Sequence, residues 1–514
     1  MRPIPPSEAS TEAPATWRNL PRKDQLFVLA FCRVFDFMQV ASFQTICYYQ
    51  LKSFNSTLSE ETISWQSGIA SGSFSAAQIF TAIIWGRIAD AEWGGRKRVL
   101  LIGLWGTALG CVGLAFSRSF MAVVMFRLLA GGSNGTVGII RTMISENIKE
   151  RKHQSRAFLL LPASFMVASV TGPVIGSWLA EPVATFPSLF AANSWLASFP
   201  YALPALFSAA SMMIIGLVVF LTIEETHSIR KYHFDLGLHS ASIIKRVFKR
   251  NSHEEYAAVG NDDQESEDED IELPEVKAPM TLDPLAAKLE PSFRSIWTRN
   301  VITTLLAQAI FDFHMGAFGN LLPLFLSSPR LSSPNTRALP FIFTGGLGMS
   351  PRSVGLALAI LGFIGIALQF LIYPRLNTRL GNVLCFRIFS SLFPVAYTLA
   401  PFLALIPSSS SFTAVKWLSI TAVIGIHTTG RIFVLPATIV LLNNCAPDPS
   451  VLGMVHGVGQ TTSAFFRTAG PVVAGWGFGR SWEAGVIGAV WWTMAGVAVG
   501  GWVASLGVWE RRGK

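Results

Sequence analysis

The sequence predicts an all-α polytopic membrane protein, with twelve transmembrane helices arranged as two six-helix bundles. Of its 514 residues, 51% are hydrophobic and only 14% are charged, and the mean hydropathy is +0.45. A soluble protein of this length needs more charge to cover its surface. The apolar stretches are continuous and reach the roughly 20 residues that a helix needs to cross a bilayer core of about 30 Å. A β-barrel is disfavoured because its strands would alternate apolar and polar residues.

Twelve apolar stretches can be placed on the chain, six on each side of a polar central segment. The first six cover about 25–49, 64–88, 98–117, 119–143, 156–180 and 201–223. The second six cover about 299–326, 352–374, 382–405, 416–441, 453–479 and 484–508. These positions predict an N-terminal tail (1–24), a first bundle (25–223), a central loop (224–298), a second bundle (299–508) and a C-terminal tail (509–514).

The distribution of lysine and arginine predicts the orientation. Loops on one side of the spans carry clusters of cations: Arg22/Lys23, Arg96/Lys97/Arg98, Lys149/Arg151/Lys152/Arg156, Arg375/Arg379 and Arg511/Arg512/Lys514. Loops on the other side carry only the scattered cations Lys52, Arg118, Arg330 and Arg337. Because cytosolic loops are enriched in lysine and arginine, both termini are expected in the cytosol. The net charge of +9 therefore reflects membrane orientation, and no nucleic-acid partner is expected.

The two halves of the chain repeat weakly in sequence. The first stretch reads VFDFM around Asp36 and the seventh reads IFDFH around Asp312. The fifth reads TGPVIGSW and the eleventh reads AGPVVAGW, while the second ends in WGRIAD and the eighth in YPRLNT. Parallel repeats of six spans predict two bundles around a central cavity, which is the architecture of alternating-access carriers.

The central loop has a basic part followed by an acidic part. Residues 228–250 are basic, and their apolar and cationic mixture is suited to the anionic inner leaflet. Residues 261–275 are almost wholly acidic, are expected to be disordered, and contain the candidate phosphorylation site Ser266. A solvated linker between the halves is the simpler interpretation.

Charged residues inside the spans are the candidates for coupling, because each costs roughly 2.5–3.5 kcal/mol at mid-bilayer on insertion scales. Arg33 and Asp36 lie three residues apart on one helical face. They form either a structural ion pair, or a site where Asp36 takes up a proton. Asp312 has no arginine close by in its own stretch and shares a helical stripe with Gln308. It is the strongest single candidate for a proton-carrying or substrate-binding carboxylate.

Further polar side chains are predicted to line the cavity. The eleventh stretch carries four on one face, at spacings of 4, 3 and 4 residues: His456, Gln460, Ser463 and Arg467. This stripe would suit a polar or anionic substrate group, or it is a polar seam buried against another helix. His427 and Arg431 of the tenth stretch are additional candidates that no motif supports.

The segment 86–98, GRIADAEWGGRKR, joins the second and third stretches. It resembles the corresponding loop of major facilitator superfamily transporters, whose pattern is G-x-x-x-D-x-x-G-R-K. Five residues match by type and are called the gate motif here: Gly86, Asp90, Gly95, Arg96 and Lys97. Two extra residues separate Asp90 from Gly95, which leaves open which cation meets Asp90. The resemblance implies that the cluster stabilises one closed state at the cytosolic side, with Gly86 packing against the other half. The corresponding segment of the second half, YPRLNTRLGN, has no acidic residue. The gate is therefore expected to be asymmetric and to depend on the first half.

Two further patterns are similar to those of the superfamily. Arg127, followed by Gly131 and Gly135, is similar to the fourth span of proton-coupled members. That resemblance implies that Arg127 modulates proton transfer, although snorkelling or a structural pair would also explain it.

Proline inside the fifth stretch predicts a bend, because it lacks an N–H group and clashes with the carbonyl four residues back. The stretch with Gly172, Pro173 and Gly176 resembles the antiporter motif of the superfamily, which implies export. Gly470 and Pro471 predict a second bend, which leaves open that a bend here is general to carriers.

Longer segments narrow the resemblance to one branch. LPRKDQLFVLAFCRVFDF, RLLAGG, TVGIIRTMISE and ERKHQSRAF are similar to drug:proton antiporters of the tetracycline-resistance-like and zinc-induced-facilitator-like branch, in particular its fungal members. The resemblance implies the major facilitator fold and a place in the plasma or vacuolar membrane.

The expected function is secondary active transport: proton-coupled export of a small organic molecule by alternating access. The expected partners are the lipid bilayer, the substrate and protons, for a chain acting as a monomer without a cofactor or metal. An enzyme is not expected, because no nucleophile or metal-binding motif stands in a suitable context. The alternatives are a nutrient importer or facilitator of the same fold, and a non-transporting membrane receptor or scaffold.

Overall fold

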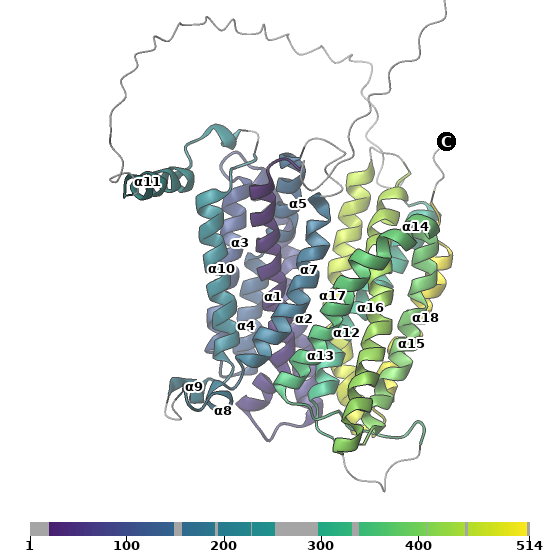
Figure 1. The fold of residues 1–514 in the computed structure, drawn as a ribbon. Helices are drawn as coiled ribbons and strands as arrows, with labels where there is room; N and C mark the ends of the chain where they lie inside the picture. Colours follow the sequence, from purple (N-terminus) through teal and green to yellow (C-terminus); the bar gives the residue numbers. More distant parts are fainter. Residues whose placement is uncertain are drawn as a thin grey trace, which may run out of the picture.

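A computed structural model describes residues 20–148, 157–190, 194–227, 229–251, 297–330, 339–407, 409–447 and 451–510. The acidic segment 261–275 and the chain ends therefore lie outside the described residues. Long helices form two groups that stand side by side (Figure 1). The first group contains α1 (Lys23–Phe54), α2 (Glu60–Asp90), α3 (Arg96–Ala115), α4 (Phe120–Ser133), α5 (Thr136–Asn147), α7 (Leu160–Trp178) and α10 (Ala202–Thr222). The second contains α12 (Arg299–Ser327), α13 (Pro351–Ala367), α14 (Tyr373–Ser390), α15 (Leu392–Leu399), α16 (Thr413–Asn444), α17 (Leu452–Glu483) and α18 (Gly488–Leu506).

The described helices agree with the predicted spans. Ten helical stretches are long and apolar enough to cross a membrane. One of them runs from Pro351 to Leu405 and turns inside α14 at Gly381, whose φ of 76° is unfavourable for other residues. Dividing this stretch at Gly381, and adding the 32-residue α17, gives twelve spans within the described residues.

The fourth predicted stretch differs from the expectation of one helix. It is divided into α4 and α5 at Asn134, whose φ and ψ of −84° and 86° are not helical. The side chain of Asn134 accepts hydrogen bonds from the backbone N–H and the hydroxyl of Thr136, and so competes with the helical pattern. The break lies beside a buried carboxylate, described below.

Shorter helices mark the two ends of the molecule. The helix α11 (Leu236–Asn251) lies across one end, next to α10, and this is called the α11 end (Figure 1). The helices α8 (Pro182–Thr185) and α9 (Trp195–Ser198) mark the opposite end, called the α8 end. The predicted central loop thus contains a helix in its basic part.

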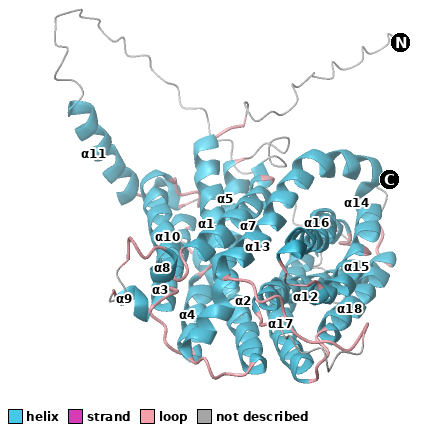
Figure 2. Cartoon of the chain, turned by 60° about the horizontal axis from the view of Figure 1, so that its bottom comes forward, coloured by secondary structure: helices cyan, strands magenta, loops and turns pink. Residues whose placement is uncertain are grey.

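The two groups of helices touch along two seams toward the α8 end. In the first, α2 crosses α17 so closely that a Cβ atom on Gly68 would lie 2.5 Å from the carbonyl oxygen of Pro471. In the second, α7 crosses α13, and a Cβ atom on Gly355 would lie 2.6 Å from the carbonyl oxygen of Pro173. Figure 2 shows both pairs of helices side by side at this end. Small residues permit such close crossings in membrane proteins.

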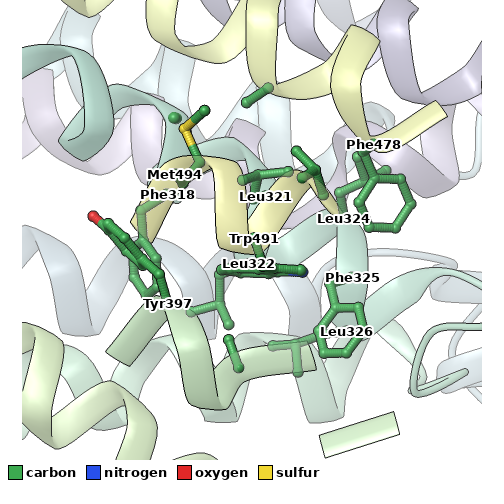
Figure 3. Close-up of a cluster of buried hydrophobic side chains, with 14 of the residues drawn as sticks. Phe318, Leu321, Leu322, Leu324, Phe325, Leu326, Tyr397, Phe478, Trp491 and Met494 are labelled. Carbon is green, nitrogen blue, oxygen red and sulfur yellow. The ribbon is translucent and has the colours of Figure 1, made fainter. Parts of the chain in front are cut away.

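A cluster of large apolar side chains fills the second group of helices (Figure 3). Phe318 and Phe325 of α12 meet Tyr397 of α15 and Trp491 of α18, and all four are almost completely buried. Lipid chains are as apolar as these side chains, so close packing rather than removal from water stabilises the cluster. The cluster fixes α12, which carries Asp312, against its neighbours.

Candidate functional site

A cavity of about 770 Å³ opens between the two groups of helices at the α11 end. Its walls come from α2, α5 and α17, and its polar and charged lining residues include Gln78, Asp90, Arg96, Asn134, Arg141, Thr142, Gln460 and Arg467. Since both seams lie toward the α8 end, this structure is closed there and open at the α11 end. The charged groups of the lining are three arginines and one aspartate, so the cavity favours negative charge.

A smaller pocket of about 120 Å³ also lies between the halves. It is lined by Phe37 and Gln44 of α1, by Phe165 and Pro173 of α7, and by residues of α12, α13 and α16. The last group includes Phe318, His427 and Arg431. The sequence named His427 and Arg431 only as cavity candidates, and the structure places both in this pocket.

The gate motif forms an ion-pair network at the α11 end. Arg96 Nη1 lies 2.6 Å from Asp90 Oδ1, and Arg96 Nη2 lies 3.1 Å from Glu146 Oε1. Arg96 also donates to the carbonyl oxygen of Ala89. The cation that meets Asp90 in this structure is therefore Arg96. Gly86 lines the cavity, with open space where its Cβ atom would be, so it does not pack against the other half in this state.

A strap formed by residues 223–227 and 229–235 contacts the gate motif, and sequence reasoning missed it. The Glu225 carboxylate accepts hydrogen bonds from the backbone N–H groups of Arg96 and Lys97, at 3.0 and 3.1 Å, and thus caps α3. Lys97 pairs with Asp235 at 2.7 Å. Two adjacent acids directly after an apolar stretch, Glu224 and Glu225, were the available signal.

Asp36 is buried, and both of its carboxylate oxygens accept hydrogen bonds. It pairs with Arg33, and its Oδ1 accepts from Asn134 Nδ2 at 2.6 Å. Its Oδ2 also accepts from Thr136 Oγ1 at 3.1 Å. The break between α4 and α5 supplies both of these donors. The structure therefore contains the ion pair between Arg33 and Asp36, which was one of the two interpretations of their spacing.

Arg127 stands apart from that pair. It is 2% exposed, and its guanidinium lies over the rings of Phe43 and Phe74, at 4.4 and 4.8 Å. It donates to Gln39 and to the carbonyl oxygen of Ala70, both at 3.4 Å. No carboxylate of the described chain pairs with it, so Arg127 and Asp36 do not form one site in this structure.

Asp312 lies between α12 and α17. The residue is 8% exposed, and the polar neighbours of its carboxylate are Gln308, Ser463 and Arg467. The structure thus brings together one residue predicted from α12 and two from the polar stripe of α17 around Asp312. His456 is separate: its Nε2 atom lies 3.3 Å from Asn443 Oδ1. Gln460 lines the cavity at the α11 end.

Both predicted proline residues lie inside helices, α7 and α17. Beside them, glycines allow close crossings within each half. Cβ atoms on Gly172 and Gly176 would lie 2.8 Å from Ala41 Cβ and 2.5 Å from Ser42 Oγ of α1. A Cβ atom on Gly470 would lie 2.8 Å from the backbone nitrogen of Ala317 in α12. Each proline also contributes its carbonyl to a seam, so these positions connect packing within a half to contact between the halves.

Comparisons with known proteins agree with this architecture. A model of the Major Facilitator Superfamily matches residues 26–345. The Major facilitator superfamily multidrug transporter mfsB of Aspergillus fumigatus is 30% identical, over 95% of this chain and 84% of that protein. Protein ZINC INDUCED FACILITATOR-LIKE 1 of Arabidopsis thaliana is 25% identical, over 88% of this chain and 82% of that protein. The crystal structure of the human organic anion transporter MFSD10 (TETRAN) superposes with a TM-score of 0.56 at 17% identity, covering 94% of this chain and 99% of that one. That likeness concerns the fold alone.

Proposed function

The chain belongs to the Major Facilitator Superfamily, and from this premise we propose that it is a proton-coupled exporter of small organic molecules that works by alternating access. The chain is a transporter and an integral multi-pass membrane protein. The predicted branch, with multidrug, zinc-induced-facilitator-like and tetracycline-resistance-like relatives, is confirmed.

The observation that carries the proposal is the cavity of about 770 Å³ that lies between the halves at the α11 end. Basic residues gather at this end, among them Arg22, Lys97 and Arg98, so the positive-inside rule assigns it to the cytosol. A substrate would therefore enter from the cytosol. Opening the two seams at the α8 end while closing the gate motif at the α11 end would then release it on the other side. The resemblance of the Pro173 segment to the antiporter motif, and the multidrug transporter among the relatives, support export.

Asp312 is the proposed proton carrier. Loading a proton onto Asp36 would disrupt an ion pair and two further hydrogen bonds, whereas Asp312 lies at the contact between α12 and α17. Protonation there would remove the negative charge beside Arg467, which lines the cavity. A membrane potential of 100 mV and one pH unit together supply about 3.7 kcal/mol per proton, enough for a gradient of roughly several hundredfold.

Replacing Asp312 by asparagine tests the proposal. Cells that express the wild-type chain should release metabolites that cells without it retain, and an untargeted comparison of the two would identify them. We expect Asp312→Asn to abolish proton movement when these metabolites are added to proteoliposomes that contain a pH-sensitive dye. The exposed Asp24, in the first turn of α1, provides the matched control Asp24→Asn, which should behave like the wild type.

Three outcomes would contradict the proposal or the role of Asp312 in it. Higher metabolite retention in cells that express the chain would indicate an importer. Identical metabolite profiles with and without the chain would favour a receptor or scaffold. Unchanged proton movement in Asp312→Asn would remove this residue from the coupling.

A further inference from the structure

The small pocket between the halves holds polar atoms without partners. His427 is fully buried, and neither ring nitrogen has a hydrogen-bond partner in the described chain. The Nε atom of Arg431, one helical turn further along α16, is also buried without a partner. Buried polar groups are nearly always hydrogen-bonded, and leaving a donor unpaired is costly. Both side chains line the pocket, so a molecule bound there against Arg431 and His427 would supply the missing hydrogen-bond partners.

Arg431 also has no counter-ion in the part of the chain that the structure describes. Among the described residues, no carboxylate lies within ion-pairing distance of its guanidinium, and no acidic residue lines the pocket. A cation inside a membrane protein that lacks a protein partner indicates a functional site. The planar guanidinium is suited to two parallel hydrogen bonds with a carboxylate, sulfonate or phosphate group.

The walls of the pocket are aromatic. The guanidinium of Arg431 lies 4.0 Å from the ring centroid of Phe165, which belongs to the other half of the molecule. The His427 ring is stacked on Phe318, with centroids 3.5 Å apart. Phe37 meets Phe165 edge to face, at 4.9 Å. Figure 3 shows Phe318 beside Tyr397 in the packed cluster of the second half, which holds that ring in place. The cation and the unpaired donors therefore stand beside rings that can cover an apolar body.

The larger cavity between the halves is itself cationic. Arg141 and Arg467 are exposed in its lining, and only Arg467 has an acidic neighbour, Asp312. The backbone of Arg467 packs against α12 at Gly316, next to the pocket residue Met315. Arg141 has no ion-pair partner among the described residues. The positive charge of this cavity would concentrate anions between the halves and repel cations.

We propose that the pocket is a binding site for small organic anions, with the anionic group held by Arg431 and His427 and an aromatic or apolar body placed against Phe37, Phe165 and Phe318. If the bound anions are also the transported molecules, the site defines the substrate class of the transporter. This part of the inference rests on the proposed function. Its residues come from both halves, so an occupant would contact the surfaces that separate when the carrier changes state.

Three aromatic probes of similar size and different charge test the proposal: benzenesulfonate, benzenesulfonamide and benzyltrimethylammonium. Equilibrium dialysis with the purified full-length chain in detergent measures their binding without a proton gradient. We expect benzenesulfonate to bind at least about tenfold more tightly than the neutral and the cationic probe, because only the anion pairs with Arg431. Tighter binding of either other probe by the wild-type chain would overturn the proposal.

Substitutions then locate the site. Arg431→Gln should weaken benzenesulfonate binding by at least about tenfold, and Arg431→Lys should weaken it less. Arg352→Gln is the matched control, because Arg352 also lies over aromatic rings, those of Trp178 and Phe186, but is exposed and outside the pocket. Loss of binding in Arg141→Gln, with binding retained in Arg431→Gln, would move the anion to the outer cavity and overturn the pocket assignment.

The two proposals can fail separately. Benzenesulfonate binding that depends on Arg431 would support the anion site even if no proton moves in proteoliposomes. Proton-coupled export limited to neutral or cationic metabolites would support the transport function and overturn the anion site.

Discussion

Two glycines of the gate motif have opposite surroundings. Gly95 adopts a φ of 104°, and a Cβ atom there would lie 2.5 Å from Glu225 Oε2. Gly86 lies in a helix, with nothing within 4 Å of the position of its Cβ atom. The sequence assigned both to one motif, because a pattern of residue types does not reveal which position lacks space. The contact that distinguishes them comes from the strap, about 130 residues further along the chain.

At Gly95 we expect substitution by alanine to destabilise the protein. Gly95→Ala combines an unfavourable backbone conformation with a clash against the carboxylate that caps α3, which should cost about 1–3 kcal/mol. Gly86→Ala is the control and should retain or slightly increase stability, since alanine is favoured over glycine inside a helix. Thermal unfolding of the two purified variants in detergent measures the difference. Equal melting temperatures would show that the strap does not hold Gly95 as described.

For the buried carboxylates of Asp36 and Asp312, the residue types alone do not reveal the hydrogen-bond partners. The spacing of Arg33 and Asp36 correctly suggested that they meet, because residues three apart share a helical face. The other donors to Asp36 lie 98 and 100 residues away, at Asn134 and Thr136. Likewise, the partners of Asp312 on α17 follow from helix packing. Local sequence could therefore identify these acids but not their hydrogen bonding.

At the scale of elements, α7 contains a proline and contacts helices of its own half as well as a helix of the other half. Its glycines pack against α1 within the first half, and the carbonyl of Pro173 meets α13 of the second half. Because proline cannot donate to the Ser169 carbonyl, α7 lacks one helical hydrogen bond at this crossing. The helix is therefore weakest where the halves must separate.

Restoring that hydrogen bond should impair the conformational change. We expect Pro173→Ala to slow transport by about three- to tenfold in proteoliposomes, while the protein still reaches the membrane in normal amounts. Pro204→Ala is a suitable control, since Pro204 lies in the first turn of α10, where proline removes no helical hydrogen bond. A normal rate in Pro173→Ala would exclude the bend as a hinge.

At the scale of the whole molecule, the two halves are closed at the α8 end and open at the α11 end. Ser67 and Ser71 of α2 donate to Asn320 of α12 across the interface, at 3.1 and 3.0 Å. In contrast, Gln460 is exposed in the cavity of the α11 end. The five native cysteines are free and buried, so introduced thiols can be labelled against a low background.

Thiol labelling with a membrane-impermeant maleimide should report this asymmetry and its orientation. We expect the Gln460→Cys variant to react in inside-out vesicles but not in intact cells, because the α11 end is assigned to the cytosol. The Ser67→Cys variant should remain unreactive in both preparations, because its position is buried in the closed interface. Labelling of Gln460→Cys in intact cells would reverse the orientation, and rapid labelling of Ser67→Cys would show that another state predominates.

The sequence by itself determined the membrane class, the spans, the two repeated halves and the members of the gate motif, because hydropathy and helical spacing are local properties of the chain. Only the tertiary structure decided that Arg96 meets Asp90, that the strap caps α3, and that α4 and α5 separate at Asn134. It also placed Arg431 of one half against Phe165 of the other, which created the pocket proposed for organic anions. These features depend on contacts between residues far apart in the chain, and such contacts form only when the helices pack.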